Sequence, residues 1–313
     1  MSQKIEDLQD KIQDVRDEVS KKVVGQEDII ELLLVSMVCD GNALLESNPG
    51  LAKTMMVRSI ADVTDMSFSR IQNTPDLMPS DVTGTEVIRE SAEGSKEFIF
   101  EKGPIFANVV LADEINRATP KTQASFLEAM EEEQVTASGK TYDLPRPFFV
   151  LATQNPIDQE GTYPLPEAQK DRFMMKLTVD YPEREEEAEI VDRYTQQWED
   201  DIELEKVLTG DELLRAQEMV RDIPVADDIR DRAIEIVANT RDSEEIEFGA
   251  SPRASLSLVL GGKGMAFLNG RNYVSEEDLE EMSVPVLRHR IVVDFRAERD
   301  GVTPEQAVRN LLE

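Results

Sequence analysis

The chain has little cysteine, little histidine and no long hydrophobic run, and each shortage excludes a class of protein. A single cysteine, Cys39, rules out an internal disulfide, suits a reducing cytoplasm and is expected to be a buried thiol. The one histidine, His289, cannot build a metal cluster by itself, so a structural role is expected. No apolar run approaches the roughly 20 residues that span a bilayer, and the polar start 1–6 lacks the apolar stretch of a signal peptide. We therefore expect a cytoplasmic protein without membrane insertion.

Positive charge is scarce as well. The chain has 34 Lys and Arg residues against 65 Asp and Glu residues, a net charge of −31 at pH 7. Such a surface repels phosphate backbones, and the chain has no basic stripe, so direct binding of nucleic acid and a DNA-dependent motor are not expected. The acidic residues are spread along the whole chain, as in proteins of salt-accumulating halophiles. An ordinary acidic cytoplasmic protein is the alternative.

The residues that are present predict a folded protein of more than one domain. The chain has 313 residues, of which 40% are hydrophobic and 32% charged. Residues 1–22 carry apolar side chains on one helical face, which predicts a helix docked on the body rather than a coiled coil. Residues 23–182 alternate between helices and short apolar strands, which predicts an α/β domain with a parallel sheet flanked by helices. Residues 183–313 have a nearly all-helical pattern and are predicted to form a second, all-α domain.

Within the α/β domain we expect strands at 43–46, 68–71, 107–113, 148–152 and 173–177. The dipeptide Thr119-Pro120 predicts the start of a helix, with Thr at the N-cap and Pro at the first helical position. Two β-hairpins are expected as inserts, one pairing 82–88 with 97–100 across 92–95, the other pairing 134–137 with 141–144 across 138–140. Trp198 is expected to pack between domains.

A candidate phosphate-binding loop follows the first predicted strand and opens a helix. Backbone N–H groups and the helix N-terminus in this context favour phosphate oxygens. Lys53 would reach the β- and γ-phosphates of ATP, and the hydroxyl of Thr54 would bind Mg²⁺. Ser47 and Ala52 stand where the strict pattern has glycine, and we expect Ser47 to be strained if the loop needs a positive φ there. The loop alone would also fit a chance turn; its residues are Ser47, Asn48, Pro49, Gly50, Leu51, Ala52, Lys53 and Thr54.

Polar groups at the ends of two other strands support the nucleotide site. Val109 to Ala112 is an apolar run that ends in Asp113 and Glu114. Asp113 would lie in the Mg²⁺ shell, and Glu114 would polarise the attacking water. Asn155 follows the fourth predicted strand, where an amide could orient water or the γ-phosphate, although an Asn before Pro also suits a turn.

Together these motifs resemble the MoxR family of AAA+ ATPases, and the resemblance covers nearly the whole chain after residue 20. Its motifs are Asn48-Pro49-Gly50-Leu51-Ala52-Lys53-Thr54, Thr74-Pro75-Asp76-Leu77-Met78-Pro79-Ser80-Asp81, Asp113-Glu114-Ile115-Asn116-Arg117-Ala118, Ala152-Thr153-Gln154-Asn155-Pro156, Tyr163-Pro164-Leu165-Pro166-Glu167-Ala168, Gly249-Ala250-Ser251-Pro252-Arg253-Ala254 and Pro285-Val286-Leu287-Arg288-His289-Arg290.

The resemblance implies roles for further residues. Gly25 and Gln26 would lie near the adenine, and Asn155 would be the sensor-1 residue. Arg253, in a helical lid, would be a sensor-2 arginine touching the γ-phosphate in its own subunit, and Arg172 would be an arginine finger entering the neighbour's site. The resemblance further implies a ring oligomer, usually a hexamer. It also implies chaperone-like remodelling or maturation of a partner with a von Willebrand factor A domain. A slow regulatory switch that hydrolyses ATP little is the alternative function.

Overall fold

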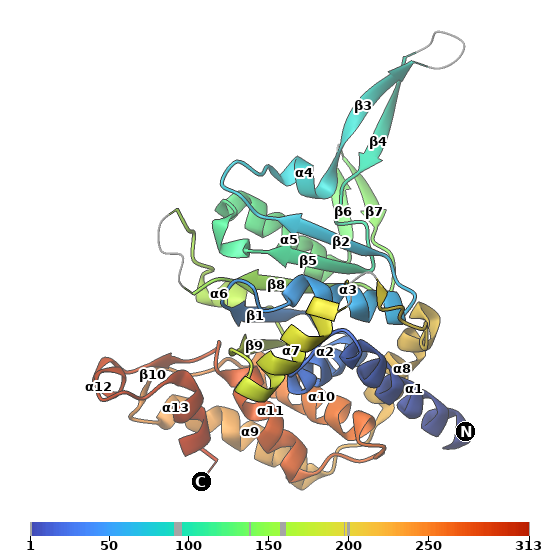
Figure 1. Cartoon of the computed structure of the whole chain (residues 1–313). Coiled ribbons are helices and arrows are strands. Elements are labelled where there is room, and N and C mark those ends of the chain that lie inside the picture. The colour runs from blue at the N-terminus through green and yellow to red at the C-terminus, as the bar shows by residue number, and fades with distance from the viewer. Residues whose placement is uncertain are drawn as a thin grey trace.

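The computed structural model describes residues 2–90, 96–137, 139–156, 161–196, 198 and 201–312. The hairpin loop at 92–95 and Ser138 of the second hairpin lie outside the described residues. A parallel sheet with helices on both of its faces forms the centre of the molecule, and a mainly helical region lies below it (Figure 1).

The sheet is five-stranded, in the order β2-β5-β8-β1-β9, and all its neighbouring strands run parallel. Its strands are β1 (Ala43–Ser47), β2 (Phe68–Gln72), β5 (Val109–Asp113), β8 (Phe149–Gln154) and β9 (Met175–Val179). The predicted strands and their parallel pairing are therefore confirmed. Because β5, β8 and β1 are neighbours and run parallel, their carboxyl ends meet at one edge of the sheet.

Alternating side chains of the strands form a core on each face of the sheet. On β5, Val109 and Leu111 face one core, whereas Val110 and Ala112 face the other, and all four are fully buried. Helix α5 (Pro120–Glu132) covers the second face with buried Phe126, and the side chain of Thr119 caps it as predicted. The first face is covered by helices that continue into the helical region, so the two regions share one core.

Three further helices surround the first core. They are α1 (Ser2–Ser20), α2 (Glu27–Val38) and α3 (Lys53–Val63). The apolar stripe of α1 is buried at Ile12, Val15 and Val19, which confirms that this helix docks on the body. Short elements of the α/β region are α4 (Pro79–Thr83), the 3-10 helix η1 (Ile115–Arg117) and α6 (Glu167–Lys170). The first hairpin was expected to start at residue 82, but α4 ends at Thr83 and the strand starts at Gly84.

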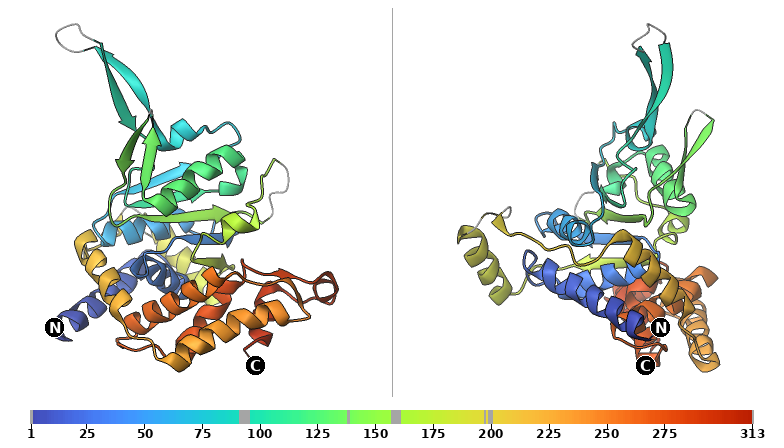
Figure 2. Two further views of the ribbon diagram at one scale, coloured as in Figure 1. Left: turned by 180° about the vertical axis from the view of Figure 1, so that it is seen from behind. Right: turned by 90° about the vertical axis from the view of Figure 1, so that its right-hand side faces the viewer.

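Both predicted hairpins are present and project from the same end of the molecule (Figures 1 and 2). They are β3 (Gly84–Glu90) with β4 (Lys96–Lys102), and β6 (Gln134–Ala137) with β7 (Lys140–Asp143). Phe100 of the first stacks on Tyr142 of the second, with ring centroids 4.2 Å apart. Farther out, Ile88 pairs with Phe98, and these side chains are 60% and 70% exposed. The longer hairpin thus presents an apolar pair to solvent.

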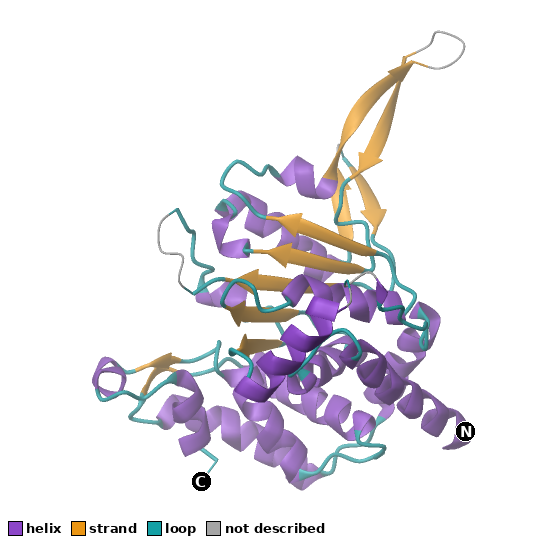
Figure 3. Cartoon of the chain, viewed as in Figure 1, coloured by secondary structure: helices purple, strands orange, loops and turns teal. Residues whose placement is uncertain are grey.

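The second region is mainly helical, as expected and as Figure 3 shows, but a short pair of strands within it was not predicted. Its helices are α7 (Arg184–Gln196), α8 (Gly210–Asp222), α9 (Asp227–Asp242), α10 (Pro252–Leu268), α11 (Glu276–Leu287), α12 (Phe295–Arg299) and α13 (Pro304–Asn310). Between them, β10 (Ile246–Phe248) pairs antiparallel with β11 (Val292–Val293). Strands of two or three residues are too short to leave a period in the sequence. Trp198 is 81% exposed, so its predicted packing role is also wrong.

Candidate nucleotide site and a separate arginine pair

The candidate phosphate-binding loop connects the carboxyl end of β1 to the first residue of α3, Lys53. Its strain does not lie where the sequence suggested. Ser47 is the last residue of the strand and has no positive φ, whereas Gly50 and Ala52 have φ angles of 84° and 53°. A Cβ in the left-handed region costs roughly 1–2 kcal/mol, so Ala52 rather than Ser47 stores the strain.

The start of α3 is suited to an anion. Ala52 is its N-cap and supplies no side-chain hydrogen bond to the first turn. A helix N-terminus carries N–H groups without intrahelical partners and a partial positive charge. A Cβ built on Gly50 would meet no atom within 4 Å, so the loop is open at this point. The loop therefore fits a phosphate group.

Asp113 and Glu114 are anchored together by a residue that the sequence analysis missed. The hydroxyl of Thr153, a fully buried residue of β8, donates a 2.7 Å hydrogen bond to Oδ1 of Asp113. The hydroxyl oxygen of Thr153 also accepts a 2.9 Å hydrogen bond from the backbone N–H of Glu114. Glu114 has a φ of 54°, so its backbone turns sharply just after β5. Thr153 thus fixes the carboxylate of Asp113 and the backbone of Glu114 at the edge of the sheet.

Three more side chains hold these carboxylates. Arg70 on β2 donates to Oδ2 of Asp113 from Nε at 3.1 Å and from Nη2 at 2.5 Å. Oε2 of Glu114 accepts a 2.8 Å hydrogen bond from Gln72 and lies 3.4 Å from Nη1 of Arg117. The carboxylate of Asp113 is a hard oxygen ligand of the kind Mg²⁺ prefers. Arg70 occupies Oδ2, so coordination of Mg²⁺ by this oxygen requires Arg70 to move aside.

Asn155 is largely buried. Because it directly follows β8, it lies at the same edge of the sheet as Asp113 and Glu114.

Gly25 and Gln26 precede α2, and helix α7 lies against this segment. A Cβ added to Gly25 would come within 2.4 Å of the Glu186 carboxyl group. The hydroxyl of Tyr194 on α7 donates to the carbonyl of Lys22 and lies 3.4 Å from Sδ of Met55 in α3. The segment before Gly25 is therefore close to the helix of the phosphate loop, and the adenine role of Gly25 and Gln26 stays a prediction.

The two predicted catalytic arginines lie together, but away from this site. Nη1 of Arg172 is 2.6 Å from Oε2 of Glu131, and Nη2 of Arg253 is 3.2 Å from Oε1 of the same carboxylate. The three residues line one cavity of about 500 Å³ with Gly41 and Asn42, which precede β1. They therefore lie at the amino edge of the sheet, whereas the phosphate loop lies at its carboxyl edge.

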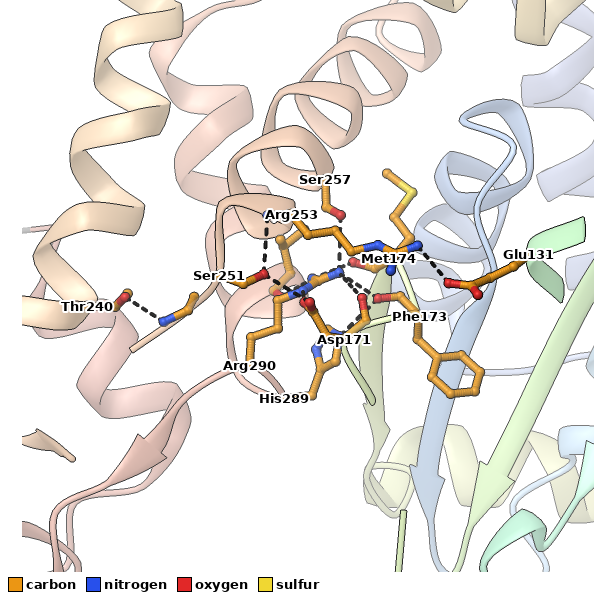
Figure 4. A network of polar contacts seen from close by, with 12 residues as sticks. Glu131, Asp171, Phe173, Met174, Thr240, Ser251, Arg253, Ser257, His289 and Arg290 are labelled. Carbon is orange, nitrogen blue, oxygen red and sulfur yellow. Dashed lines mark hydrogen bonds and ion pairs between the residues drawn. The ribbon is translucent and has the colours of Figure 1, made fainter. Parts of the chain in front are cut away.

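This placement corrects the expectation for Arg253. A five-residue strand separates the two edges by about 16 Å at roughly 3.3 Å per residue. Arg253 does not reach the phosphate loop of its own chain in this structure. The cause is the position of the helical region: α10, whose first turn carries Arg253, faces the carboxyl end of α5 (Figure 4). Sequence motifs alone did not show which edge of the sheet α10 would face.

The structural role expected for His289 and the buried thiol expected for Cys39 are both confirmed. Nε2 of His289 lies 3.1 Å from the carbonyl oxygen of Phe173. Burial, followed by the charge of Arg290, holds the pKa of His289 well below its usual value, so the ring is neutral. Burial raises the pKa of the Cys39 thiol to about 12, which makes it unreactive.

Similarity to known proteins agrees with an α/β region followed by a helical region. The sequence matches a family model described as "ATPase family associated with various cellular activities (AAA)" over residues 42–175, and an AAA lid domain model over residues 238–311. Chaperone MoxR1 of Mycobacterium tuberculosis is 43% identical over 305 residues, which cover 95% of this chain and 79% of that protein. The chain belongs to the MoxR family of AAA+ ATPases.

Two further proteins are similar to this MoxR-family chain over nearly its full length. The uncharacterized protein YeaC of Bacillus subtilis is 42% identical, with 98% of this chain and 95% of that protein covered. A crystal structure of a candidate ATPase from Cytophaga hutchinsonii superposes with a TM-score of 0.92 at 41% identity, covering 99% of this chain and 96% of the other. The fold of the MoxR family, an AAA domain followed by a helical lid, is thus shown. Among the described residues, no helix combines the length and hydrophobicity needed to cross a bilayer.

Proposed function

We propose that the protein hydrolyses ATP to ADP and phosphate with Mg²⁺ and couples this reaction to chaperone-like remodelling of a partner protein. The anchoring of Asp113 and Glu114 by Thr153, beside the phosphate loop, is the observation that carries the proposal. Lys53 contacts the β- and γ-phosphates, and Thr54 and Asp113 hold Mg²⁺, which neutralises charge on the phosphates. Glu114 takes a proton from the attacking water, and Asn155 orients that water or the γ-phosphate.

We further propose that Arg172 and Arg253 both act on the nucleotide of a neighbouring subunit in a ring, usually a hexamer. The two arginine side chains are partly exposed, at 33% and 49%, and both lie at the edge of the sheet away from their own phosphate loop. Positive charge brought to the γ-phosphate by a neighbour stabilises the charge that develops during phosphoryl transfer. This replaces the expectation that Arg253 works within its own subunit.

A subunit-mixing experiment tests the proposal. Arg172→Ala subunits keep the phosphate loop but lack the finger, whereas Lys53→Ala subunits keep the finger but cannot hold nucleotide. Each variant alone should be nearly inactive, since such fingers contribute about 10³–10⁵ in rate. Mixed rings should recover partial ATPase activity, because some interfaces join an intact loop to an intact finger. Confirmed co-assembly without any recovery would leave Arg172 as the structural ion-pair partner of Glu131.

The partner protein is proposed to carry a von Willebrand factor A domain, as the family resemblance implies. The exposed pair Ile88 and Phe98 on the projecting β3–β4 hairpin is an apolar surface of the kind that contacts other proteins. A pull-down with Glu114→Gln, which should retain ATP, would identify the partner. Steady-state ATPase rates measured at high KCl would discriminate this function from the alternative, a slow regulatory switch, which predicts almost no turnover. The proposal also includes a cytoplasmic location and adaptation of the acidic surface to high salt.

A further inference from the structure

Arg290 is buried at the junction between the sheet and the helical lid, and every nitrogen of its guanidinium group is used. Its side chain is 1% exposed. Nε donates to Oδ1 of Asp171 at 2.8 Å, and Nη1 donates to the carbonyls of Met174 and Val286 at 2.9 and 2.5 Å. Nη2 donates to the carbonyls of Phe173 and Asp171 and to the hydroxyl of Ser257, at 2.7, 3.3 and 3.1 Å.

These bonds fix the backbone on both sides of Arg172. The carbonyl of the residue before it, Asp171, and that of the residue after it, Phe173, both accept hydrogen bonds from Arg290. The planar fork of arginine can hold several acceptors in fixed directions, which a lysine ammonium group cannot do. Arg290 therefore sets the position from which the side chain of Arg172 leaves the main chain.

The same network continues to Arg253. Oδ2 of Asp171, the oxygen not bound by Nε of Arg290, accepts a 2.9 Å hydrogen bond from the hydroxyl of Ser251. Ser251 caps α10, and its hydroxyl accepts a 3.2 Å hydrogen bond from the backbone N–H of Arg253. Figure 4 shows the chain of contacts from Arg290 through Asp171 and Ser251 to the first turn of α10. One carboxylate thus connects the sheet to the lid.

We infer that Arg290 is a positioning residue that holds Arg172 and Arg253 in one fixed arrangement, so that a neighbouring subunit receives both. The inference rests on the function proposed above. Arg290 is too deeply buried to reach a phosphate itself, whereas the two arginines that it positions are partly exposed and converge on Glu131. Burying the guanidinium charge of Arg290 is a costly way to stabilise a fold, because desolvation offsets much of its attraction to Asp171. A role in fixing geometry accounts for its presence here.

Arg290→Lys tests the inference, because it keeps the charge but loses the fork. The matched control is Arg271→Lys in the same lid, where Arg271 pairs with the buried carboxylate of Asp278 and contacts neither Arg172 nor Arg253. We expect Arg290→Lys to lower kcat by about 10–100-fold, the scale of a misplacement of about 1 Å. The KM for ATP should change by less than about twofold, because the variant's own phosphate loop is intact. The control should keep wild-type kcat.

Mixing with Lys53→Ala separates positioning from general damage. The Arg290→Lys subunit should hydrolyse ATP when a Lys53→Ala neighbour supplies correctly placed arginines, so activity should recover as it does with Arg172→Ala. If Arg172→Ala recovers but co-assembled Arg290→Lys does not, or if Arg290→Lys alone matches the Arg271→Lys control, the inference is overturned. If neither mixture recovers, the action of the arginines on a neighbour is refuted, and the inference falls with it.

Ser251→Ala provides a milder variant that decides the question if Arg290→Lys does not fold. It removes the hydrogen bond between Asp171 and the N-cap of α10 and leaves the bonds from Arg290 to Asp171 in place. Its control is Thr303→Ala, which removes an equivalent N-cap from α13, away from both arginines. Loss of the link should lower kcat about tenfold through misplacement of Arg253. A Ser251→Ala protein with the same kcat as Thr303→Ala would overturn the connection to Arg253.

Discussion

Thr153 offers a sharp test of how the candidate catalytic carboxylates are held. Thr153→Val keeps the shape of this fully buried side chain but removes the hydroxyl, which donates to Asp113 and accepts from the N–H of Glu114. An unsatisfied amide costs about 1–3 kcal/mol and a lost bond to a charged group about 1.5–3 kcal/mol, so the free energy of unfolding should fall by about 2.5–6 kcal/mol.

Thr153→Ser is the matched control, since it keeps the hydroxyl and removes only a buried methyl group. Its expected cost is about 0.5–1.5 kcal/mol, similar to that of other single-methyl deletions in a core. Urea denaturation followed by circular dichroism measures both variants. Only the Val variant should also lose most of its ATPase rate, because Asp113 and Glu114 lose their common anchor. Equal free energies of unfolding for the two variants would refute the anchoring role.

Three further predictions concern the phosphate loop, the general base and the acidic surface. Lys53→Ala should abolish ATP binding in calorimetry, because no other cation of the loop can face the β- and γ-phosphates; unchanged affinity would remove this loop from the site. Glu114→Gln should still bind ATP but hydrolyse it at least about 100-fold more slowly, and wild-type turnover would mean that another residue activates the water. The melting temperature should rise between about 0.1 M and about 2 M KCl, since the Debye length falls from about 10 Å to 3 Å or less and screens the self-repulsion of the net charge of −31. A flat melting temperature would contradict the adaptation to high salt.

The sheet and the phosphate loop could be predicted because their signals are local. Each buried strand is a short apolar run, and the loop lies in the predicted strand-to-helix context before Lys53. The anchoring by Thr153 and Arg70 was missed, because their bonds to Asp113 join strands that are far apart in sequence. The one available signal for Thr153 was a hydroxyl residue at the end of an otherwise apolar strand, which alone has no specific meaning.

Tertiary placement explains the remaining differences. The motif around Arg253 was found, but the edge of the sheet that it faces depends on how α10 packs against α5. Backbone angles in the loop follow from its path rather than from its residue types, so the positive φ fell on Ala52 and not on Ser47. The pair of β10 and β11 was hidden because its strands are so short.

In the proposed ring, assembly would exchange the carboxylate of Glu131 for another anion as the partner of two arginines. In the single chain, each of its two oxygens lies within ion-pair distance of one arginine, Arg172 or Arg253, so one negative charge serves two positive charges. A neighbour's bound ATP would offer these arginines a more highly charged anion in exchange. Partly exposed ion pairs are worth only about 0–1 kcal/mol each, so releasing them costs little. When nucleotide occupies one subunit's site, Arg172 and Arg253 of the next subunit would then exchange Glu131 for the nucleotide as their counter-ion.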